Sequence, residues 1–190
     1  MKRFLFTFVM FAALAATVVG CSKRERWDEK ERRAMREELR AYRDMVYLDN
    51  LADVEFDEFS GNVVEAIEID YPVYTTFVEM PGKGDTVEIY VVSTIVNELN
   101  ADAHNMRNIY PYPWLVSEGI LPAGLDHQAQ RAFYDCFARK VRNYYPSTEA
   151  FFEAVVADDP STSKLTQFQM ECANDLFDWN IIVDETVFFD

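Results

Sequence analysis

The sequence predicts a mainly α-helical protein whose single domain is a bundle or array of about six helices. Three observations support this prediction. Apolar residues recur at spacings of three and four through most of the chain, as on the buried face of a helix. Residues that commonly cap helices precede several of these stripes, and prolines separate them. The length of 190 residues and the hydrophobic share of 49% suffice for one continuous core.

The first predicted helix lies in a stem of mixed charge, residues 21–44. The stem contains nine Lys and Arg residues and seven acids, lacks Gly and Pro, and places several opposite charges four residues apart. An apolar stripe begins late in it and includes Met35, Leu39, Tyr42 and Val46. We therefore expect a solvated helical stalk whose C-terminal part docks on the body. Contact of its basic residues with anionic lipid headgroups is an alternative role.

The body, residues 45–190, starts with elements whose type stays open. Residues 53–59 alternate acidic and apolar side chains, which fits a short strand or the start of a helix. The Ser-Gly-Asn sequence at 60–62 favours a turn or a cap. Asp70 can cap a further helix that has Pro72 in its first turn.

The segment 73–96 fits two structures. It holds two runs rich in β-branched and aromatic residues around a Pro-Gly-Lys-Gly-Asp turn. This pattern predicts a small β-hairpin and makes α+β the alternative fold class. The second run also places apolar residues at helical spacing, with Asp85 and Glu88 as a capping box. We favour a helix over 86–100, and the structure of 73–80 stays open.

The C-terminal part of the chain predicts four helices and a terminal strand. Each helix has an apolar stripe, and turn residues separate it from the next. The last residues, 180–190, fit a short strand or an extended edge. The first of these helices covers 114–118, and the second runs from an N-cap at Asp126 to Tyr145. The third starts at an N-cap at Ser147, and the fourth runs from Thr162 or Ser163 to Trp179.

The N-terminus has the pattern of a signal peptide. Lys2 and Arg3 precede an apolar run, residues 4–19, that is shorter than the roughly 20 residues of a membrane-spanning helix. The Val-Val-Gly-Cys sequence that follows ends at Cys21 and resembles the lipobox of bacterial lipoproteins.

This resemblance implies a membrane anchor. In bacterial lipoproteins the signal peptide, here residues 1–20, is removed, and the cysteine, here Cys21, becomes the acylated first residue. Ser22 stands where an Asp retains many such proteins in the inner membrane, so the chain is similar to lipoproteins that are sorted to the outer membrane. The resemblance covers these residues alone.

The charge of the chain argues against nucleic acid as a main partner. The sequence has 18 Lys and Arg residues and 33 acids, a formal net charge of −15. The body alone has seven bases and 26 acids, or 7 − 26 = −19. Contacts with phosphate backbones need Lys and Arg, which the body largely lacks.

An aromatic connector is the most suggestive candidate for a binding site. Tyr110, Tyr112 and Trp114 alternate with prolines, so their rings can face a glycan or a peptide ligand. The alternative is that these rings attach the connector to the core.

The remaining candidates are cysteines and histidines. Cys136 and Cys172 lie on apolar stripes of two predicted helices and either form a disulfide or stay buried as free thiols. The two histidines, His104 and His127, are too few to indicate a zinc site. We therefore expect neither a metal nor a cofactor.

These features together predict a lipid-anchored cell-envelope protein that binds a ligand or a partner protein and is not an enzyme. An accessory subunit of an outer-membrane complex is one alternative. A hydrolase of envelope polymers with a carboxylate pair, such as Glu65 and Glu68, is another. A binder should have a hollow near Tyr112 and Trp114, and a subunit should have an exposed apolar patch or open strand edge. An enzyme should have two convergent carboxylates, one with a raised pKa.

Overall fold

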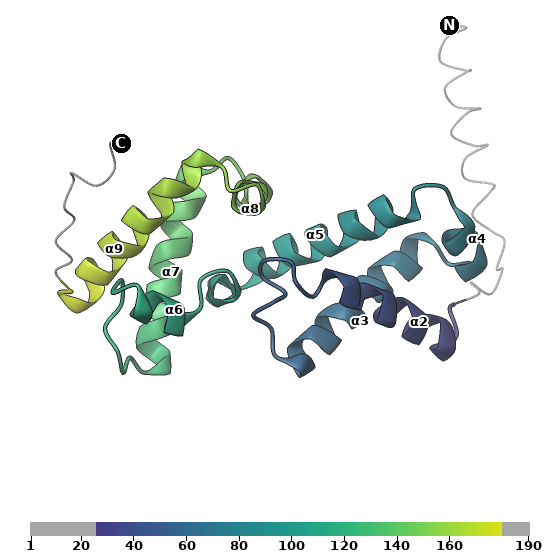
Figure 1. The fold of residues 1–190 in the computed structure, drawn as a ribbon, viewed down its shortest axis with the longest axis horizontal. Helices are drawn as coiled ribbons and strands as arrows, with labels where there is room; N and C mark the ends of the chain where they lie inside the picture. The colour runs from purple at the N-terminus through teal and green to yellow at the C-terminus, as the bar shows by residue number, and fades with distance from the viewer. Residues whose placement is uncertain (1–25, 180–190) are drawn as a thin grey trace, which may run out of the picture.

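The computed structural model describes residues 26–179, and these residues are mainly helical, as the sequence predicts (Figure 1). No strand occurs among them. Short 3-10 helices lie at Arg40–Tyr42, Ala103–Asn108 (η2) and Pro160–Thr162. The α-helices are α2 (Glu29–Leu39), α3 (Asp53–Asp70), α4 (Tyr74–Glu79), α5 (Lys83–Ala101), α6 (Tyr112–Ser117), α7 (His127–Tyr144), α8 (Thr148–Val156) and α9 (Ser163–Phe177).

The helices form two neighbouring groups along the long axis of the molecule (Figure 1). The first group contains α2 to α5, in which α2 and α5 both pack against α3. The second contains α6 to α9, in which α9 packs against α7. Helix α5 also contacts η2 and α8, and thereby connects the two groups. One hydrophobic core therefore extends through both.

Helix α2 is part of this core from its start. Asp28 caps it and forms a reciprocal capping box with Glu31. The indole N–H of the preceding Trp27 donates to the carbonyl of Tyr71, and the buried Trp27 ring packs edge-on against Tyr74. The chain thus contacts the body ahead of Met35, where docking was expected to begin, so α2 is a packed helix with one solvated face.

The segment 53–70 forms one continuous helix, α3. The turn expected at 60–62 is wrong, because Gly61 lies in the interior of this helix. Glycine there costs about 1 kcal/mol relative to alanine, which the burial of four apolar side chains on one face outweighs. Asp70 ends α3 and does not cap a following helix. The four buried side chains are Phe56, Phe59, Val63 and Ile67.

The hairpin expected as an alternative over 73–96 is wrong, and the helix predicted over 86–100 is confirmed. Gly82 adopts a left-handed conformation with φ of 74°, and its carbonyl accepts the N–H of Thr86 at 3.0 Å. Helix α5 therefore begins at Lys83, ahead of the capping box expected at Asp85. One face of α5 is buried over more than three turns, which outweighs the β-propensity of its residues. Its buried side chains are Val87, Val91, Ile95 and Leu99.

The predicted caps of the C-terminal helices are confirmed. The Asp126 carboxylate accepts the N–H of Ala129 at 2.8 Å at the start of α7. The Ser147 hydroxyl accepts the N–H of Ala150 at 3.1 Å at the start of α8. Among the described residues, no helix is both long enough and apolar enough to cross a membrane. The signal peptide, Cys21 and the strand expected at 180–190 lie outside the described residues.

Candidate functional site

The aromatic connector leads from η2 into α6 and is fixed at Tyr110. The Tyr110 ring is half-buried and packs edge-on against Phe137 of α7, with ring centroids 5.5 Å apart. Its carbonyl accepts the hydroxyl of Tyr134 at 2.8 Å. The Tyr110 ring also contacts the Trp114 ring, at a centroid distance of 5.9 Å. Tyr110 thus connects the surface ring of Trp114 to the core.

Tyr112 has the structural role that was the alternative to ligand binding, because it attaches a loop. Its hydroxyl donates to the carbonyl of Pro122 and accepts the N–H of Leu125, both at 2.9 Å. The loop between α6 and α7 is held by these two bonds. Tyr112 therefore fixes the connector to this loop and does not line the surface hollow beside the connector.

The surface hollow lies beside Trp114, and its volume is about 260 Å³. The Trp114 side chain is 41% exposed, which is unusual for so large an apolar group. The amide of Asn50 donates to the carbonyl of Asn108 at 3.0 Å and so reaches the hollow from the loop before α3. The residues that line the hollow are Asn50, Ile109, Tyr110, Pro111 and Trp114.

We call this set the aromatic hollow. Two of the three residues that the sequence singled out line it, Tyr110 and Trp114. Asn50 was missed, because it is distant in sequence and only the tertiary fold brings it there. Burial raises the pKa of the Tyr110 hydroxyl above its ordinary value, so this group is neutral at physiological pH. The aromatic hollow offers apolar faces and the acceptor Oδ1 of Asn50, whose Nδ2 donates to Asp49 Oδ1 and to the Asn108 carbonyl. This set suits binding better than acid–base chemistry.

A second hollow of about 300 Å³ lies between α2 and the C-terminal part of α3. Glu68 is buried and forms a two-pronged ion pair with Arg32, whose Nε and Nη2 each lie 2.9 Å from one carboxylate oxygen. The hydrogen bond from Arg32 lowers the pKa of the Glu68 carboxyl. The residues that line this hollow are Arg26, Arg32, Arg36, Gly61, Val64, Glu65, Glu68, Ile69 and Pro72.

The carboxylate pair of the hydrolase alternative belongs to this second hollow. Glu65 and Glu68 both line it, but Arg32 holds Glu68 in its ionised form. A general acid needs the opposite shift. Burial does raise the pKa of Glu98, which accepts a 2.6 Å hydrogen bond from the hydroxyl of Tyr47, but Glu98 lines neither hollow.

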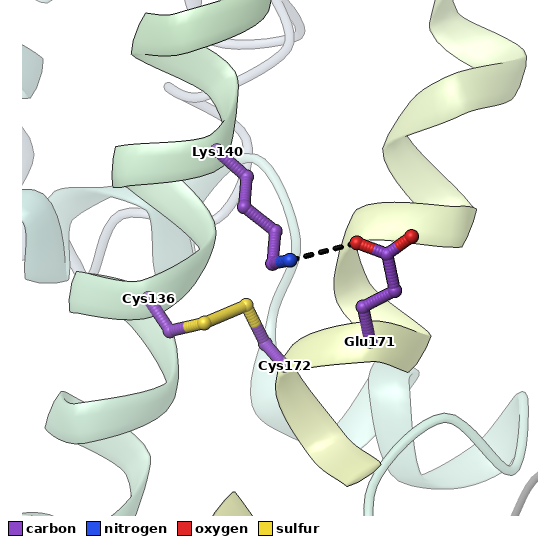
Figure 2. The surroundings of a disulfide bond; sticks show 4 residues. All are labelled: Cys136, Lys140, Glu171 and Cys172. Carbon is purple, nitrogen blue, oxygen red and sulfur yellow. Dashed lines mark hydrogen bonds and ion pairs between the residues drawn. A yellow bond between two sulfur atoms is a disulfide. The ribbon is translucent and has the colours of Figure 1, made fainter. Parts of the chain in front are cut away.

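Cys136 and Cys172 form a disulfide between α7 and α9 (Figure 2). The Cα atoms of Cys136 and Cys172 are 5.9 Å apart, and both side chains are buried. Lys140 lies one turn further along α7 and pairs with Glu171 of α9, with Nζ and Oε2 2.7 Å apart (Figure 2). A covalent bond and an ion pair thus join the same two helices.

The two histidines contact one another, although they lie 23 positions apart in the chain. The rings of His104 and His127 have centroids 5.1 Å apart. His104 is buried, and this burial lowers its pKa. Within residues 26–179, no three His, Cys, Asp or Glu side chains lie close enough together to hold a metal ion.

The described residues thus define a small helical module with an arginine-lined hollow on the first helix group and an aromatic hollow that Asn50 of the first group and the connector into α6 line together. No protein-family model, curated protein or solved structure matches this chain. Its function is therefore inferred from the two hollows and from the N-terminal sequence.

Proposed function

We propose that the protein is a lipid-anchored protein of the bacterial cell envelope that binds a glycan at the aromatic hollow. The observation that carries the proposal is the Trp114 ring, 41% exposed beside a hollow that also contains Tyr110 and the Asn50 amide. An exposed indole face beside a hydrogen-bonding group is suited to a ligand with one apolar and one polar side. A sugar ring has both.

The volume of the aromatic hollow limits what it can hold. Pockets for drug-sized ligands measure roughly 300–1,000 Å³, and this hollow measures about 260 Å³. It therefore accommodates one ring of a longer chain, and the rest of the ligand extends over the surface. A polymer of sugar rings meets this requirement. A peptide that inserts one proline or aromatic side chain is the second ligand class to test.

Binding to sugar polymers tests the proposed site. The chain from Ser22 to the C-terminus contains all the described residues and would be mixed with peptidoglycan sacculi, a soluble N-acetylglucosamine tetramer or a proline-rich peptide. Trp114→Ala should weaken binding to the sacculi and the tetramer by about fivefold or more, the loss expected of a central interface residue. Tyr144→Ala is the matched control, because Tyr144 is an aromatic residue of similar exposure, 45%, on α7.

The control separates binding from folding. Equal binding by the wild type and Trp114→Ala, together with a lower melting temperature of the variant, would make Trp114 a structural residue and refute the site. Equal losses in both variants would refute it as well. Binding of the peptide alone would replace the glycan by a peptide ligand.

Acylation tests the proposed anchor. A bacterial host that expresses the full chain would be fed labelled palmitate, and the protein should incorporate the label. Cys21→Ala should abolish incorporation and leave an unprocessed or soluble form, whereas the neighbouring change Ser22→Ala should retain it. A Cys21→Ala chain that is processed and still held in the membrane would contradict the anchor.

A further inference from the structure

The second hollow gathers three guanidinium groups in a chain of net charge −15. Arg26, Arg32 and Arg36 all line it, together with the carboxylates of Glu65 and Glu68. The lining alone has a balance of 3 − 2 = +1, and Glu29, which pairs with Arg36, brings the balance of these six groups to zero, whereas the chain as a whole has a net charge of −15. A cluster of arginines at one hollow of an acidic protein indicates an anionic ligand. We call this set the arginine hollow.

The guanidinium groups are held at two of these positions. Arg32 is oriented by both carboxylate oxygens of Glu68, which is itself buried. Arg36 is steadied on the rim by Glu29, whose Oε1 lies 2.7 Å from Nη2. Arg26 is exposed and directly precedes the buried Trp27. Such planar, always-charged groups match the geometry of a phosphate.

Part of the lining of the arginine hollow is apolar, beside the carboxylates of Glu65 and Glu68. This part consists of Val64, Ile69 and Pro72. The Ile69 side chain is 60% exposed, and that of Val73, next in the chain to Pro72, is 41% exposed. Inorganic phosphate has no apolar part that could cover these groups. A phospholipid has a phosphate and, directly beside it, the boundary of the acyl region, where such side chains are favourably placed.

The position of the hollow in the chain favours the same ligand. Arg26 lies five positions after Cys21, and five steps of extended chain span at most about 18 Å. If Cys21 carries the acyl anchor, Arg26 lies within that distance of the membrane. We propose that the arginine hollow binds the phosphate of an anionic phospholipid headgroup and so orients the protein on the membrane. The inference rests on the proposed anchor for its location.

Vesicle binding of the non-acylated chain tests this proposal. The chain from Ser22 onward lacks Lys2 and Arg3, so its net charge is 16 − 33 = −17 and its overall charge opposes binding to anionic lipid. It should nevertheless bind vesicles of phosphatidylglycerol mixed with phosphatidylcholine more tightly than vesicles of phosphatidylcholine alone. The partition coefficient should fall as salt screens the charges.

A matched pair of variants locates the binding. Arg26→Gln/Arg36→Gln should lower the partition coefficient by about thirtyfold, from about fivefold for each arginine at an anionic surface. Arg32 is left unchanged, because its loss would leave the buried Glu68 carboxylate without its ion-pair partner. Arg139→Gln/Arg142→Gln removes the same charge from exposed positions on α7 and should have little effect. Circular dichroism would confirm that both variants fold.

Three results would overturn the proposal. Equal losses in both double variants would mean that only net charge matters, and equal binding to the two vesicle types would exclude headgroup recognition. Saturable binding of soluble glycerol phosphate without vesicle binding would make the ligand a free phosphate. Because the tested chain is not acylated, these results are independent of the anchor. Failure of palmitate labelling would overturn the anchor and leave the vesicle results unchanged.

Discussion

Breaking the Cys136–Cys172 disulfide should lower the free energy of unfolding by about 4 kcal/mol. The bond closes a loop with a sequence separation of 36 residues, which contains α8 and parts of α7 and α9. In the chain-entropy model, such a crosslink removes about 13 cal/mol/K from the unfolded state, from 2.1 + 1.5R ln 36. Multiplied by room temperature, this entropy gives about 4 kcal/mol, a large part of the stability of a typical domain.

Urea unfolding and thermal unfolding measure this effect for two independent perturbations, reduction and substitution. The oxidised chain would be compared with the same chain in reductant and with Cys136→Ala/Cys172→Ala. The melting temperature should fall by about 8–16 °C in both cases, from about 2–4 °C per kcal/mol for a chain of this size. Lys140→Met is the control, because it breaks the neighbouring ion pair between α7 and α9 and keeps the covalent bond. Its cost should stay below about 1 kcal/mol, as for other partly exposed pairs.

Agreement between reduction and the double substitution would assign the loss to the loop. A change of less than about 1 kcal/mol on reduction would refute the reasoning, because the unfolded chain would then gain little freedom. A large loss in the alanine variant alone would point to the packing of the two buried side chains. The expected loss matters in the cell only where the compartment is oxidising, as outside the bacterial inner membrane.

Three further predictions concern the ion pair, the loop and the helix glycines. Arg32→Leu should cost about 2–3 kcal/mol in urea unfolding, because it leaves Glu68 buried without its partner. The pKa of Glu68 in the folded state is lowered from 4.5, so the stability that this ion pair contributes is complete above pH 4.5 and is lost as the pH falls through the lowered pKa. Glu68→Gln should remove this part of the pH dependence of unfolding. An unchanged dependence of stability on acid pH in that variant would contradict the role given to Glu68. Tyr112→Phe should cost about 1–2 kcal/mol by removing both loop hydrogen bonds, with sugar binding unchanged; a loss of affinity at constant melting temperature would instead place Tyr112 in the site. Gly82→Ala should destabilise the fold by about 1 kcal/mol, because Gly82 has a positive φ. Gly61→Ala should stabilise the fold by about 0.5–1 kcal/mol, because the space around the added Cβ is open. Melting temperatures of the two variants that shift in the same direction would refute this contrast.

The elements that the sequence predicts well are those in which two local signals coincide. Helices α7 and α8 each combine a capping residue with an apolar stripe, and both start where the sequence predicts. At α5 the signals conflicted, since β-branched residues favoured a strand and their spacing favoured a helix. Packing against neighbouring helices decided this case in favour of the spacing. The β-propensity of these residues alone therefore predicted a hairpin where the chain is helical.

The candidate sites depended on contacts that the sequence does not contain. The stripe of aromatic residues identified Trp114 and Tyr110. Local spacing could not show that the Tyr112 hydroxyl bonds the loop between α6 and α7. The sequence does not indicate the arginine hollow as a unit, because its arginines and α3 come together only in the fold. Its signal was the four-residue spacing of Arg32 and Arg36, which places both on one face of α2. What faces them is known only from the fold.

The continuity of α3 has a consequence for both proposals. Asn50 of the aromatic hollow lies just before the first residue of α3, and Glu68, Ile69 and Pro72 of the arginine hollow lie at its other end. With 18 residues at 1.5 Å each, the helix is about 27 Å long, which places Glu68 and Ile69 more than about 20 Å from its first residue. At this distance charges are screened and substitutions act independently, so variants of one hollow should leave binding at the other unchanged.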